Sequence, residues 1–320
     1  MASIVLILFG FLLLGGGGEL LVRGASSLGL LARLTPAVVG LTVVAMGTSM
    51  PELVVSVNAA LRGSPALAVG NVVGSNIFNV AAILGIAALI APLRIQGNSL
   101  RLEWPVMFLA AFQLHLLARD GIVDRLEGGF LFVALIIFTA YVVYMARRSA
   151  AAPVGEEYAE TMNVLGGEGA RAWVLSGLAV LAGMGLLMVG ASFLVEGAVD
   201  LARAAGVSET VIGLTVVAAG TSLPELAASA IASWRGRDDM AVANVIGSSI
   251  FNVLGILGIT ALIHPLPVPP EILARDNWWM LGLSLLLWPL MRRGMRVTRL
   301  EGGILVGAFL VYLGVLLTGT

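Results

Sequence analysis

The sequence contains no cysteine and no lysine, and only two of its 320 residues are histidine. Without cysteine the chain can form neither disulfide bonds nor thiolate metal sites. Charged residues make up 12% of the chain, whereas a soluble domain has about 25%. Hydrophobic residues make up 59%, and the mean hydropathy is +1.01. This composition excludes an ordinary soluble protein and indicates a chain that lies largely within a membrane.

Long apolar segments account for most of the chain. A helix that crosses a bilayer needs about 20 mostly apolar residues. Ten segments are of this kind: residues 3–22, 36–61, 66–91, 102–118, 127–146, 172–193, 209–234, 240–263, 272–291 and 301–318. We therefore expect an all-α polytopic membrane protein with ten transmembrane helices. The first segment has no basic region before it and no A-x-A cleavage site, so we expect it to be a retained span.

The 18 basic residues, all of them arginine, are distributed unevenly between the loops. The loops after the even-numbered spans hold only five of them: Arg62, Arg119, Arg125, Arg203 and Arg275. Basic loop residues favour the cytoplasmic side of a membrane. We therefore expect a cell (inner) membrane protein with both termini outside and a cytoplasmic segment at residues 148–171.

Two stretches of the chain, residues 40–93 and 213–266, are near copies at a constant offset of 173 residues. Each opens with GLTVVA-x-GTS-x-PEL and closes with GS-x-IFNV-x-x-ILGI. The motif RLEGG extends the match, because it occurs at residues 125–129 and again at 299–303. The chain is therefore expected to consist of a first repeat at 1–147, a linker rich in Ala, Gly and Glu at 148–171, and a second repeat at 172–320.

The number of spans in each half determines how the halves are related. Each half carries five of the predicted spans, and five is odd, so the second half enters the membrane from the opposite side. This gives two inverted-topology repeats of five helices, related by a pseudo-two-fold axis in the membrane plane. Transporters built in this way place their substrate site near the midplane, where the repeats meet.

One carboxylate lies at the centre of each copy, within a long apolar run: Glu52 in the first and Glu225 in the second. A charged side chain at the centre of a membrane helix costs roughly 3 kcal/mol or more. The sequence offers no arginine within these spans to pair with either glutamate. The same charge in the same polar context in both halves indicates a cation site shared between the repeats.

Polar side chains accompany each glutamate at helical spacing. Thr48 and Ser49 share a helix face with Glu52. Pro51 has no N–H group, so we expect the helix to kink near Gly47 and to free carbonyl groups there. At membrane depth, free carbonyl groups are tolerated only inside the protein or beside a cavity. Polar side chains recur in the next turn, the next span and the second copy: Ser56, Asn71, Ser75, Asn79, Thr221, Ser222, Ser229, Asn244, Ser248 and Asn252.

These side chains offer oxygen ligands, which hard cations such as Ca²⁺ and Na⁺ prefer. The two histidines, His115 and His264, lie near the ends of spans and are expected to be interfacial polar residues. Two glutamates would neutralise one Ca²⁺, two or more Na⁺, or in part protons, and a site that must be filled by either species is the basis of antiport. Close helix packing is an equally good explanation for part of the set: Ser56, Asn71, Ser229 and Asn244.

The motifs GTSMPE at 47–52 and GTSLPE at 220–225, each followed by G-S-x-I-F-N, resemble the two alpha repeats of the Na⁺/Ca²⁺ exchangers, in the cation/Ca²⁺ antiporter superfamily. The resemblance covers the whole chain. It implies a prokaryotic-type exchanger without the large regulatory Ca²⁺-binding domains of the animal members. In this family alternating access is thought to involve sliding of the first and sixth spans, and the glycines of both spans suit such contacts.

By this resemblance Glu52 and Glu225 would ligate the central Ca²⁺ and share the Na⁺ sites. The resemblance also implies the remaining ligands: hydroxyl groups of Thr48, Ser49, Thr221 and Ser222, carbonyl groups of Ala45 and Ala218, hydroxyl groups of Ser75 and Ser248 for flanking Na⁺, and the amides of Asn79 and Asn252 in the middle of the site.

Two departures from symmetry or from the family pattern are visible. Family members often have an acid at one of the positions occupied here by Asn79 and Asn252. An acid there is associated with K⁺ dependence in one branch, so we expect no K⁺ requirement. Asn76 stands opposite Ser249 in the repeat, a difference beside the site to which the sequence assigns no consequence.

The expected function is antiport of Na⁺ against Ca²⁺ by alternating access at a midplane all-oxygen site. The alternative is an H⁺-coupled exchanger of Ca²⁺ or of another divalent cation. An enzyme is not expected, because neither histidine lies in a repeat core and both carboxylates occupy duplicated, non-catalytic contexts. We expect Ca²⁺ and Na⁺ as substrates, the lipid bilayer as surroundings, no cofactor, no nucleic acid and no obligate protein partner.

Overall fold

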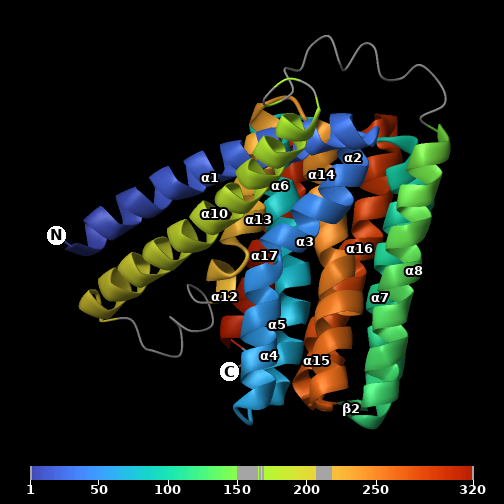
Figure 1. Cartoon of the computed structure of the whole chain (residues 1–320). Coiled ribbons are helices and arrows are strands. Elements are labelled where there is room, and N and C mark those ends of the chain that lie inside the picture. The colour runs from blue at the N-terminus through green and yellow to red at the C-terminus, as the bar shows by residue number, and fades with distance from the viewer. Residues whose placement is uncertain (1, 150–164, 166, 168, 207–217, 319–320) are drawn as a thin grey trace.

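The computed structural model describes residues 2–149, 165, 167, 169–206 and 218–318 (Figure 1). The helices of the first half, with π-helical turns η1 to η3 and a 3₁₀ turn η4, are α1 Ala2–Ala32, α2 Pro36–Val39, η1 Gly40–Val44, α3 Ala45–Thr48, α4 Met50–Leu61, α5 Pro65–Ile77, η2 Phe78–Ile83, α6 Leu84–Ile90, η3 Ser99–Glu103, α7 Trp104–Leu117, η4 Ala118–Asp120 and α8 Arg125–Ser149.

The second half repeats this order, with π-helical turns η6 and η7 and a 3₁₀ turn η8. Its helices are α10 Ala170–Ala204, α12 Ala218–Gly220, α13 Leu223–Trp234, α14 Asp238–Ile250, η6 Phe251–Leu257, α15 Gly258–Ile263, η7 Ile272–Asp276, α16 Asn277–Arg292, η8 Arg293–Met295 and α17 Arg299–Thr318. Four two-residue strands complete the described fold: β1 Leu93–Arg94, β2 Ile122–Val123, β3 Leu266–Pro267 and β4 Arg296–Val297.

The protein is an all-helical polytopic membrane protein. Within the described ranges, six helices are long and apolar enough to cross a membrane: Ala2–Ala32, Pro65–Ile90, Arg125–Arg148, Ala170–Ala204, Asp238–Ile263 and Arg299–Thr318. The bent pair Pro36–Thr48 and Met50–Leu61 makes a seventh if it is one span. This is fewer than the ten spans predicted. Helices α7 and α16 are only 14 and 16 residues long, and the predicted span 209–234 lies partly outside the described residues.

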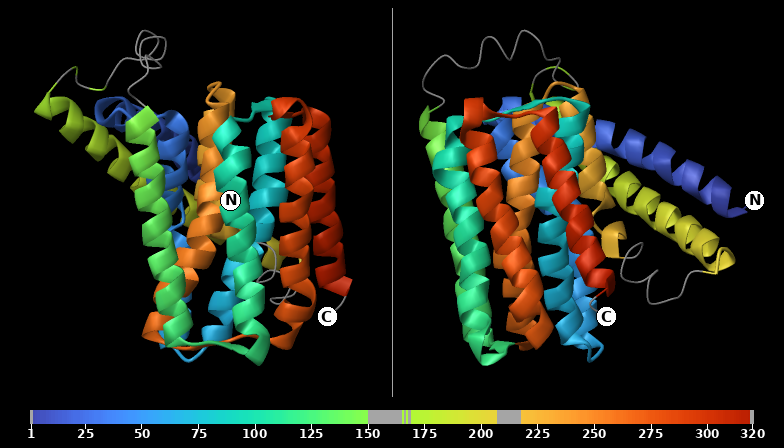
Figure 2. Two further views of the ribbon diagram at one scale, coloured as in Figure 1. Left: turned by 90° about the vertical axis from the view of Figure 1, so that its right-hand side faces the viewer. Right: turned by 180° about the vertical axis from the view of Figure 1, so that it is seen from behind.

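Two helical stretches occupy the centre of the bundle. In Pro65–Ile90 and Asp238–Ile263, 72% and 83% of the most apolar window is buried, whereas the value for α8 is 17%. These two stretches are the repeat equivalents of each other at the offset of 173. The helices α1 and α10 instead lean away from the bundle as a pair (Figures 1 and 2).

Helices α1 and α10 pack against each other through glycine. A Cβ atom added to Gly10 would lie 2.9 Å from the carbonyl oxygen of Gly190, and one added to Gly17 would lie 3.0 Å from that of Gly183. Gly183 and Gly190 are the repeat equivalents of Gly10 and Gly17. The two helices are therefore antiparallel. A two-fold rotation that exchanges the halves converts the contact between Gly10 and Gly190 into the contact between Gly183 and Gly17.

The strands pair between the halves rather than within them. Leu93 of β1 pairs with Val297 of β4, and Val123 of β2 pairs with Leu266 of β3, both antiparallel. Leu266 is the equivalent of Leu93, and Val297 is the equivalent of Val123. Figure 2 shows one such ribbon at each end of the bundle. The two ribbons thus repeat the pseudo-two-fold relation of the glycine contacts.

Candidate functional site

Two breaks between helices lie at the centre of the duplicated motif. Helix α3 ends at Thr48 and α4 begins at Met50, with a bend of 42° between the two segments. Ser49 at the break has φ −83° and ψ 6°, and Ser222 in the second half has φ −91° and ψ 8°. The bend therefore lies at Ser49, two residues after the predicted position at Gly47. Pro51 stands in the first turn of α4, where a missing N–H group costs little.

These breaks bring the two glutamates into one cluster by crosswise hydrogen bonds. Ser49 Oγ donates to Glu225 Oε1 at 2.7 Å, and Ser222 Oγ donates to Glu52 Oε1 at 2.8 Å. Each bond joins a hydroxyl of one half to the carboxylate of the other. All four side chains are at most 1% exposed. The structure therefore assembles the predicted carboxylates, from residues far apart in the sequence, at the interface of the halves.

Several oxygen atoms of this cluster are buried without a hydrogen-bond partner. They include Oε2 of Glu52, Oε2 of Glu225 and Oγ1 of Thr221. An ionised carboxylate away from water is strongly destabilised unless a cation or hydrogen-bond donors compensate its charge. The donor set consists of oxygen atoms with negative charge, so it fits a hard cation such as Ca²⁺ or Na⁺.

The central helices contribute hydroxyl groups beside the carboxylates. Ser222 Oγ lies 3.2 Å from Ser75 Oγ, which places Ser75 in the same cluster as Glu52. Ser248 Oγ contacts the carbonyl oxygen of Ala45 at 3.5 Å. The predicted residues Ser75, Ser248 and Ala45 are therefore close to the break of α3 and to its counterpart.

Two amides lie where the central helices change to π-helical turns. Asn79 is in η2 and Asn252 is in η6, and such turns occur frequently at functional sites. Both side-chain atoms of Asn79 are buried without a partner, as is Oδ1 of Asn252. The structure thus buries both predicted amides and leaves oxygen atoms of both available for a ligand.

Three further predicted ligands, Thr48, Thr221 and Ala218, have fewer contacts that connect them to the carboxylate cluster. The hydroxyl of Thr48 bonds within its own helix, to the carbonyl of Val44 at 3.1 Å. Thr221 is next to Ser222 in the second break. Ala218, the equivalent of Ala45, is the first residue of α12. The hydroxyls of Thr48 and Thr221 also lie near the carboxylates of Glu225 and Glu52, respectively, whereas the part of Ala218 in the site rests on its position in the duplicated motif.

Hydrogen bonds within each half bear on the choice between ligation and packing for four further residues. Asn71 Nδ2 donates to Ser56 Oγ at 3.0 Å, and Asn244 Nδ2 donates to Ser229 Oγ at 2.9 Å. Each pair joins neighbouring helices of one half, α4 to α5 and α13 to α14. These bonds favour the packing role for Ser56, Asn71 and Ser229, whereas Asn244 also keeps its Oδ1 atom buried without a partner.

Sequence reasoning missed the part played by Asn76. Asn252 Nδ2 donates to Asn76 Oδ1 at 3.0 Å, and Asn76 Nδ2 donates to the carbonyl oxygen of Ser249 at 3.1 Å. Asn76 therefore connects the two halves beside the site. The available signal was the mismatch between Asn76 and Ser249 in otherwise matching motifs.

Other polar features lie elsewhere. Within the described ranges, no three His, Asp or Glu side chains come close enough together to hold a metal ion, so a cation would need hydroxyl, amide or carbonyl ligands besides the glutamates. His115 contacts Asn277 Nδ2 through Nδ1 at 2.8 Å, and His264 lies at the end of α15. The histidines are thus apart from the carboxylate cluster.

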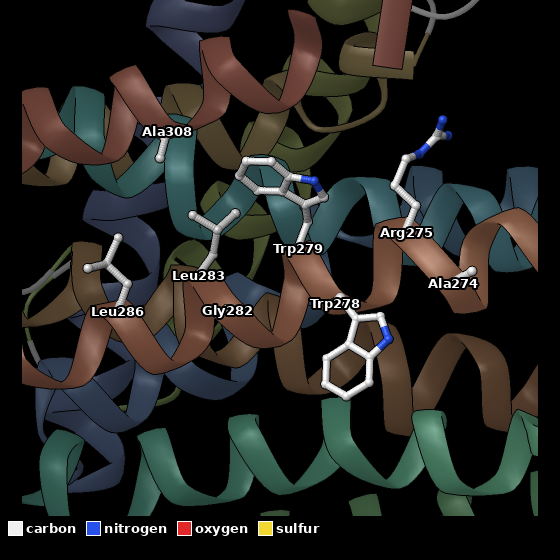
Figure 3. Close-up of a pocket in the computed structure, with 8 residues that line it drawn as sticks. All are labelled: Ala274, Arg275, Trp278, Trp279, Gly282, Leu283, Leu286 and Ala308. Atoms are coloured by element: carbon white, nitrogen blue, oxygen red, sulfur yellow. The ribbon is translucent and has the colours of Figure 1, made fainter. Parts of the chain in front are cut away.

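A pocket of about 490 Å³ lies along α16, with Ala308 of α17 at its edge (Figure 3). Its other lining residues are Ala274, Arg275, Trp278, Trp279, Gly282, Leu283 and Leu286. The lining contains no carboxylate and no predicted ligand, so this pocket is not the candidate ion site.

Comparison with known proteins agrees with the duplicated motifs. The model of a family described as sodium/calcium exchanger protein matches the chain twice, at residues 2–145 and 175–318. The chain belongs to the sodium/calcium exchanger family. The resemblance seen in the sequence is thereby confirmed. Because this is a family of membrane transporters of ions, the protein is a transporter and not an enzyme.

Three proteins of known sequence or structure illustrate the similarity. The chain is 37% identical over 317 residues to the putative antiporter CaxA of Alkalimonas amylolytica, with 98% of both chains covered. It is 36% identical over 317 residues to the inner membrane protein YrbG of Escherichia coli (strain K12), with 97% and 95% covered. Its fold matches that of the sodium-calcium exchanger NCX_Mj with a TM-score of 0.82, at 29% identity and with 98% and 99% covered. This exchanger-family chain is therefore a cation/Ca²⁺ exchanger of the NCX_Mj type.

Proposed function

We propose that the protein is a secondary active antiporter that exchanges Na⁺ for Ca²⁺ by alternating access at the site between its halves. The observation that carries the proposal is the crosswise pair of hydrogen bonds, Ser49 to Glu225 and Ser222 to Glu52. It joins two buried carboxylates from the two halves into one cluster. Any movement of one half against the other therefore acts directly on the groups that would hold the ion.

The proposed ligands are oxygen atoms from both halves. Glu52 and Glu225 carry the charge, and Ca²⁺ takes about six to eight oxygen ligands. The further proposed ligands are Thr48, Ser49, Ser75, Asn79, Thr221, Ser222, Ser248, Asn252 and the carbonyl groups of Ala45 and Ala218. Two carboxylates balance one Ca²⁺ or two Na⁺, so the same oxygen atoms serve either substrate, and the charge of the ionised pair is compensated when either substrate is bound.

We also propose ten membrane crossings, arranged as two inverted repeats at 1–147 and 172–320. The antiparallel packing of the equivalent helices α1 and α10 supports the inversion. If π-helical turns are included, the stretches Ser99–Leu117 and Ile272–Arg292 are long enough to supply two more crossings. The tenth proposed crossing, 209–234, begins outside the described residues and continues into α13.

The proposed location is the inner membrane, with both termini outside. The excess of arginine in the loops after odd-numbered spans supports this orientation, and the relative YrbG is named as an inner membrane protein. The linker 148–171 would then be cytoplasmic. Most of this linker lies outside the described residues.

The specific alternative is coupling to protons instead of Na⁺. Buried carboxylates accept protons as well as cations, and the names of CaxA and YrbG specify no counter-ion. The name of NCX_Mj does specify sodium and calcium, which favours Na⁺ as the counter-ion. Acid inhibition would not separate the two, because protons compete for the carboxylates under either coupling.

The deciding experiment is Ca²⁺ uptake into proteoliposomes loaded with Na⁺ and diluted into Na⁺-free buffer. Vesicles loaded with choline, and vesicles given a pH gradient alone, serve as controls. We expect uptake that requires internal Na⁺ and is lost in Glu52→Gln. Uptake driven by the pH gradient in choline-loaded vesicles would show that Ca²⁺ transport is coupled to H⁺ and not to Na⁺.

A further inference from the structure

The two halves differ at one buried polar position beside the site. Asn76 and Ser249 are repeat equivalents, and they are 3% and 2% exposed. Ser249 Oγ donates to the carbonyl oxygen of Val245, one turn back in its own helix, at 2.9 Å. Asn76 instead reaches across to the other half. The pseudo-symmetry of the site is therefore broken by a hydrogen-bonding side chain.

The orientation of Asn76 is determined by a backbone group. Its amide contacts the carbonyl oxygen of Ser249 at 3.1 Å, and a carbonyl oxygen can only accept a hydrogen bond. The nitrogen of Asn76 must therefore face Ser249. The contact of the same nitrogen with Met280 Sδ, a weak acceptor at 3.6 Å, has the same polarity.

The orientation of Asn252 follows from that of Asn76. Since the nitrogen of Asn76 faces Ser249, its oxygen faces Asn252, and it accepts a hydrogen bond from Asn252 Nδ2 at 3.0 Å. The oxygen of Asn252 then points away from Asn76, buried and without a partner. Nitrogen and oxygen of an amide are normally assigned from their hydrogen bonds, and here every assignment leads back to one backbone carbonyl.

We propose that Asn76 is a positioning residue that holds the amide of Asn252 with its oxygen toward the bound cation. This step rests on the proposed function, because it assigns Asn252 Oδ1 to the cation site. Asn79, the equivalent of Asn252, has neither end of its amide bonded. The site would therefore have one amide whose orientation is fixed by hydrogen bonds and one amide, that of Asn79, whose orientation is not.

Loss of the contact between Asn76 and Asn252 is expected to weaken the binding of Ca²⁺ more than the binding of Na⁺. An amide released from Asn76 can turn its N–H₂ group toward the cation, which replaces attraction by repulsion. The interaction of a dipole with an ion grows with the charge of the ion, so the loss is greater for Ca²⁺ than for Na⁺. Removal of a residue that orients a metal ligand typically lowers metal affinity by about 10- to 100-fold.

The test is equilibrium binding of ⁴⁵Ca²⁺, and its competition by Na⁺, to the purified full-length protein in detergent. The main variant is Asn76→Ser, which introduces the residue found at the equivalent position 249 and so disturbs the packing little. We expect about tenfold weaker Ca²⁺ binding and a smaller change for Na⁺. Ser249→Ala is the matched control, because that hydroxyl bonds only within its own helix, and it should bind Ca²⁺ as the wild type does.

A double-mutant cycle separates positioning from general structure. If Asn76 acts through Asn252, then Asn76→Ser adds little to the loss already caused by Asn252→Ala, while it adds fully to Asn79→Ala. Full additivity with Asn252→Ala, equal losses for Ca²⁺ and Na⁺, or wild-type binding in Asn76→Ser would each overturn the proposal. Should Asn76→Ser not fold, Asn76→Ala completes the same cycle.

The same experiment keeps the two proposals apart. The proposed function would be refuted if the wild-type protein bound no Ca²⁺, or if the Glu52→Gln variant bound Ca²⁺ normally. Wild-type binding that is lost in Glu52→Gln but unchanged in the Asn76 variants would leave the proposed function in place and remove only the positioning role.

Discussion

The hydroxyl of Ser49 donates to a carboxylate oxygen of Glu225 across the interface between the halves, at 2.7 Å. The equivalent bond runs from Ser222 to Glu52 at 2.8 Å. Each helix break thus supplies the serine that orients the glutamate of the other break. Because the two carboxylates depend on each other's half for orientation, the site exists only when both halves are in place.

Loss of either serine hydroxyl should weaken Ca²⁺ binding. A hydrogen bond to a charged group contributes about 1.5–3 kcal/mol, so we expect Ser49→Ala or Ser222→Ala to raise the Kd for Ca²⁺ roughly 10- to 100-fold. Ser56→Ala is the control, because Ser56 bonds to Asn71 in its own half. Isothermal titration with Ca²⁺ measures the Kd values. Equal losses in Ser49→Ala and Ser56→Ala would show that the crosswise bonds have no special part.

Neutralising one glutamate should abolish Ca²⁺ transport without unfolding the protein. In Glu52→Gln the amide oxygen still accepts from Ser222, so the packing is kept, but the site carries one negative charge against a divalent ion. The same holds for Glu225→Gln and Ser49. Size-exclusion chromatography checks folding, and the vesicle assay checks transport. Near-normal exchange in either variant would remove that glutamate from the site.

The main parts of the site were predictable because the two repeats are nearly identical in sequence around them. Glu52 and Glu225 stand out as duplicated charges in apolar surroundings, and charge at membrane depth needs a functional reason. The serines next to them follow from helical spacing. The crosswise pairing, in contrast, depends on how two segments 170 or more residues apart in the sequence pack together. A single sequence does not show which of its distant segments are close in space.

Two differences from the expectation have local physical reasons. The bend lies at Ser49 because Pro51 begins a new helix instead of interrupting an existing one, so the break precedes the proline by two residues. The segments predicted at 102–118 and 272–291 contain α7 and α16, which follow π-helical turns carrying Arg101, Glu103, Arg275 and Asp276. These charges shorten the apolar part below the length of a clear span.

The hydrogen-bond partner of Asn76 could not be predicted from the sequence, for a different reason. The repeat alignment shows that Asn76 and Ser249 differ, but an amide can bond in its own helix, to a neighbour or to water. Only the placement of the Ser249 carbonyl beside it determines the polarity of the hydrogen-bond chain. Such a contact depends on the register of two central helices, which periodicity does not determine.

The glycine contacts between α1 and α10 should be required for transport. A Cβ atom at Gly183 would lie 2.6 Å from Leu21 N and 2.8 Å from the carbonyl oxygen of Gly17. Backbone atoms cannot turn aside, so Gly183→Ala should separate the helices and cost about 1–3 kcal/mol, as overpacking does. Gly185→Ala is the matched control, since a Cβ atom there meets nothing within 4 Å.

The measurements for this pair are the melting temperature in detergent and the rate of Na⁺-dependent Ca²⁺ uptake. We expect Gly183→Ala to lower both, and Gly185→Ala to leave uptake unchanged without lowering the melting temperature, because alanine favours a helix more than glycine does. If both variants transport as the wild type does, close approach of α1 and α10 is not needed for the exchange cycle.

Exchange should not require K⁺. Both central amide positions, Asn79 and Asn252, lack the acid that is associated with K⁺ dependence in one branch of the superfamily. Two carboxylates are already balanced by one Ca²⁺, so a further monovalent cation would add uncompensated charge to a buried site. Replacing K⁺ by choline on both sides of the vesicle membrane should therefore leave Na⁺-dependent Ca²⁺ uptake unchanged. Stimulation by K⁺ in the wild type would contradict this charge balance, and it would mean that a further group supplies negative charge to the site.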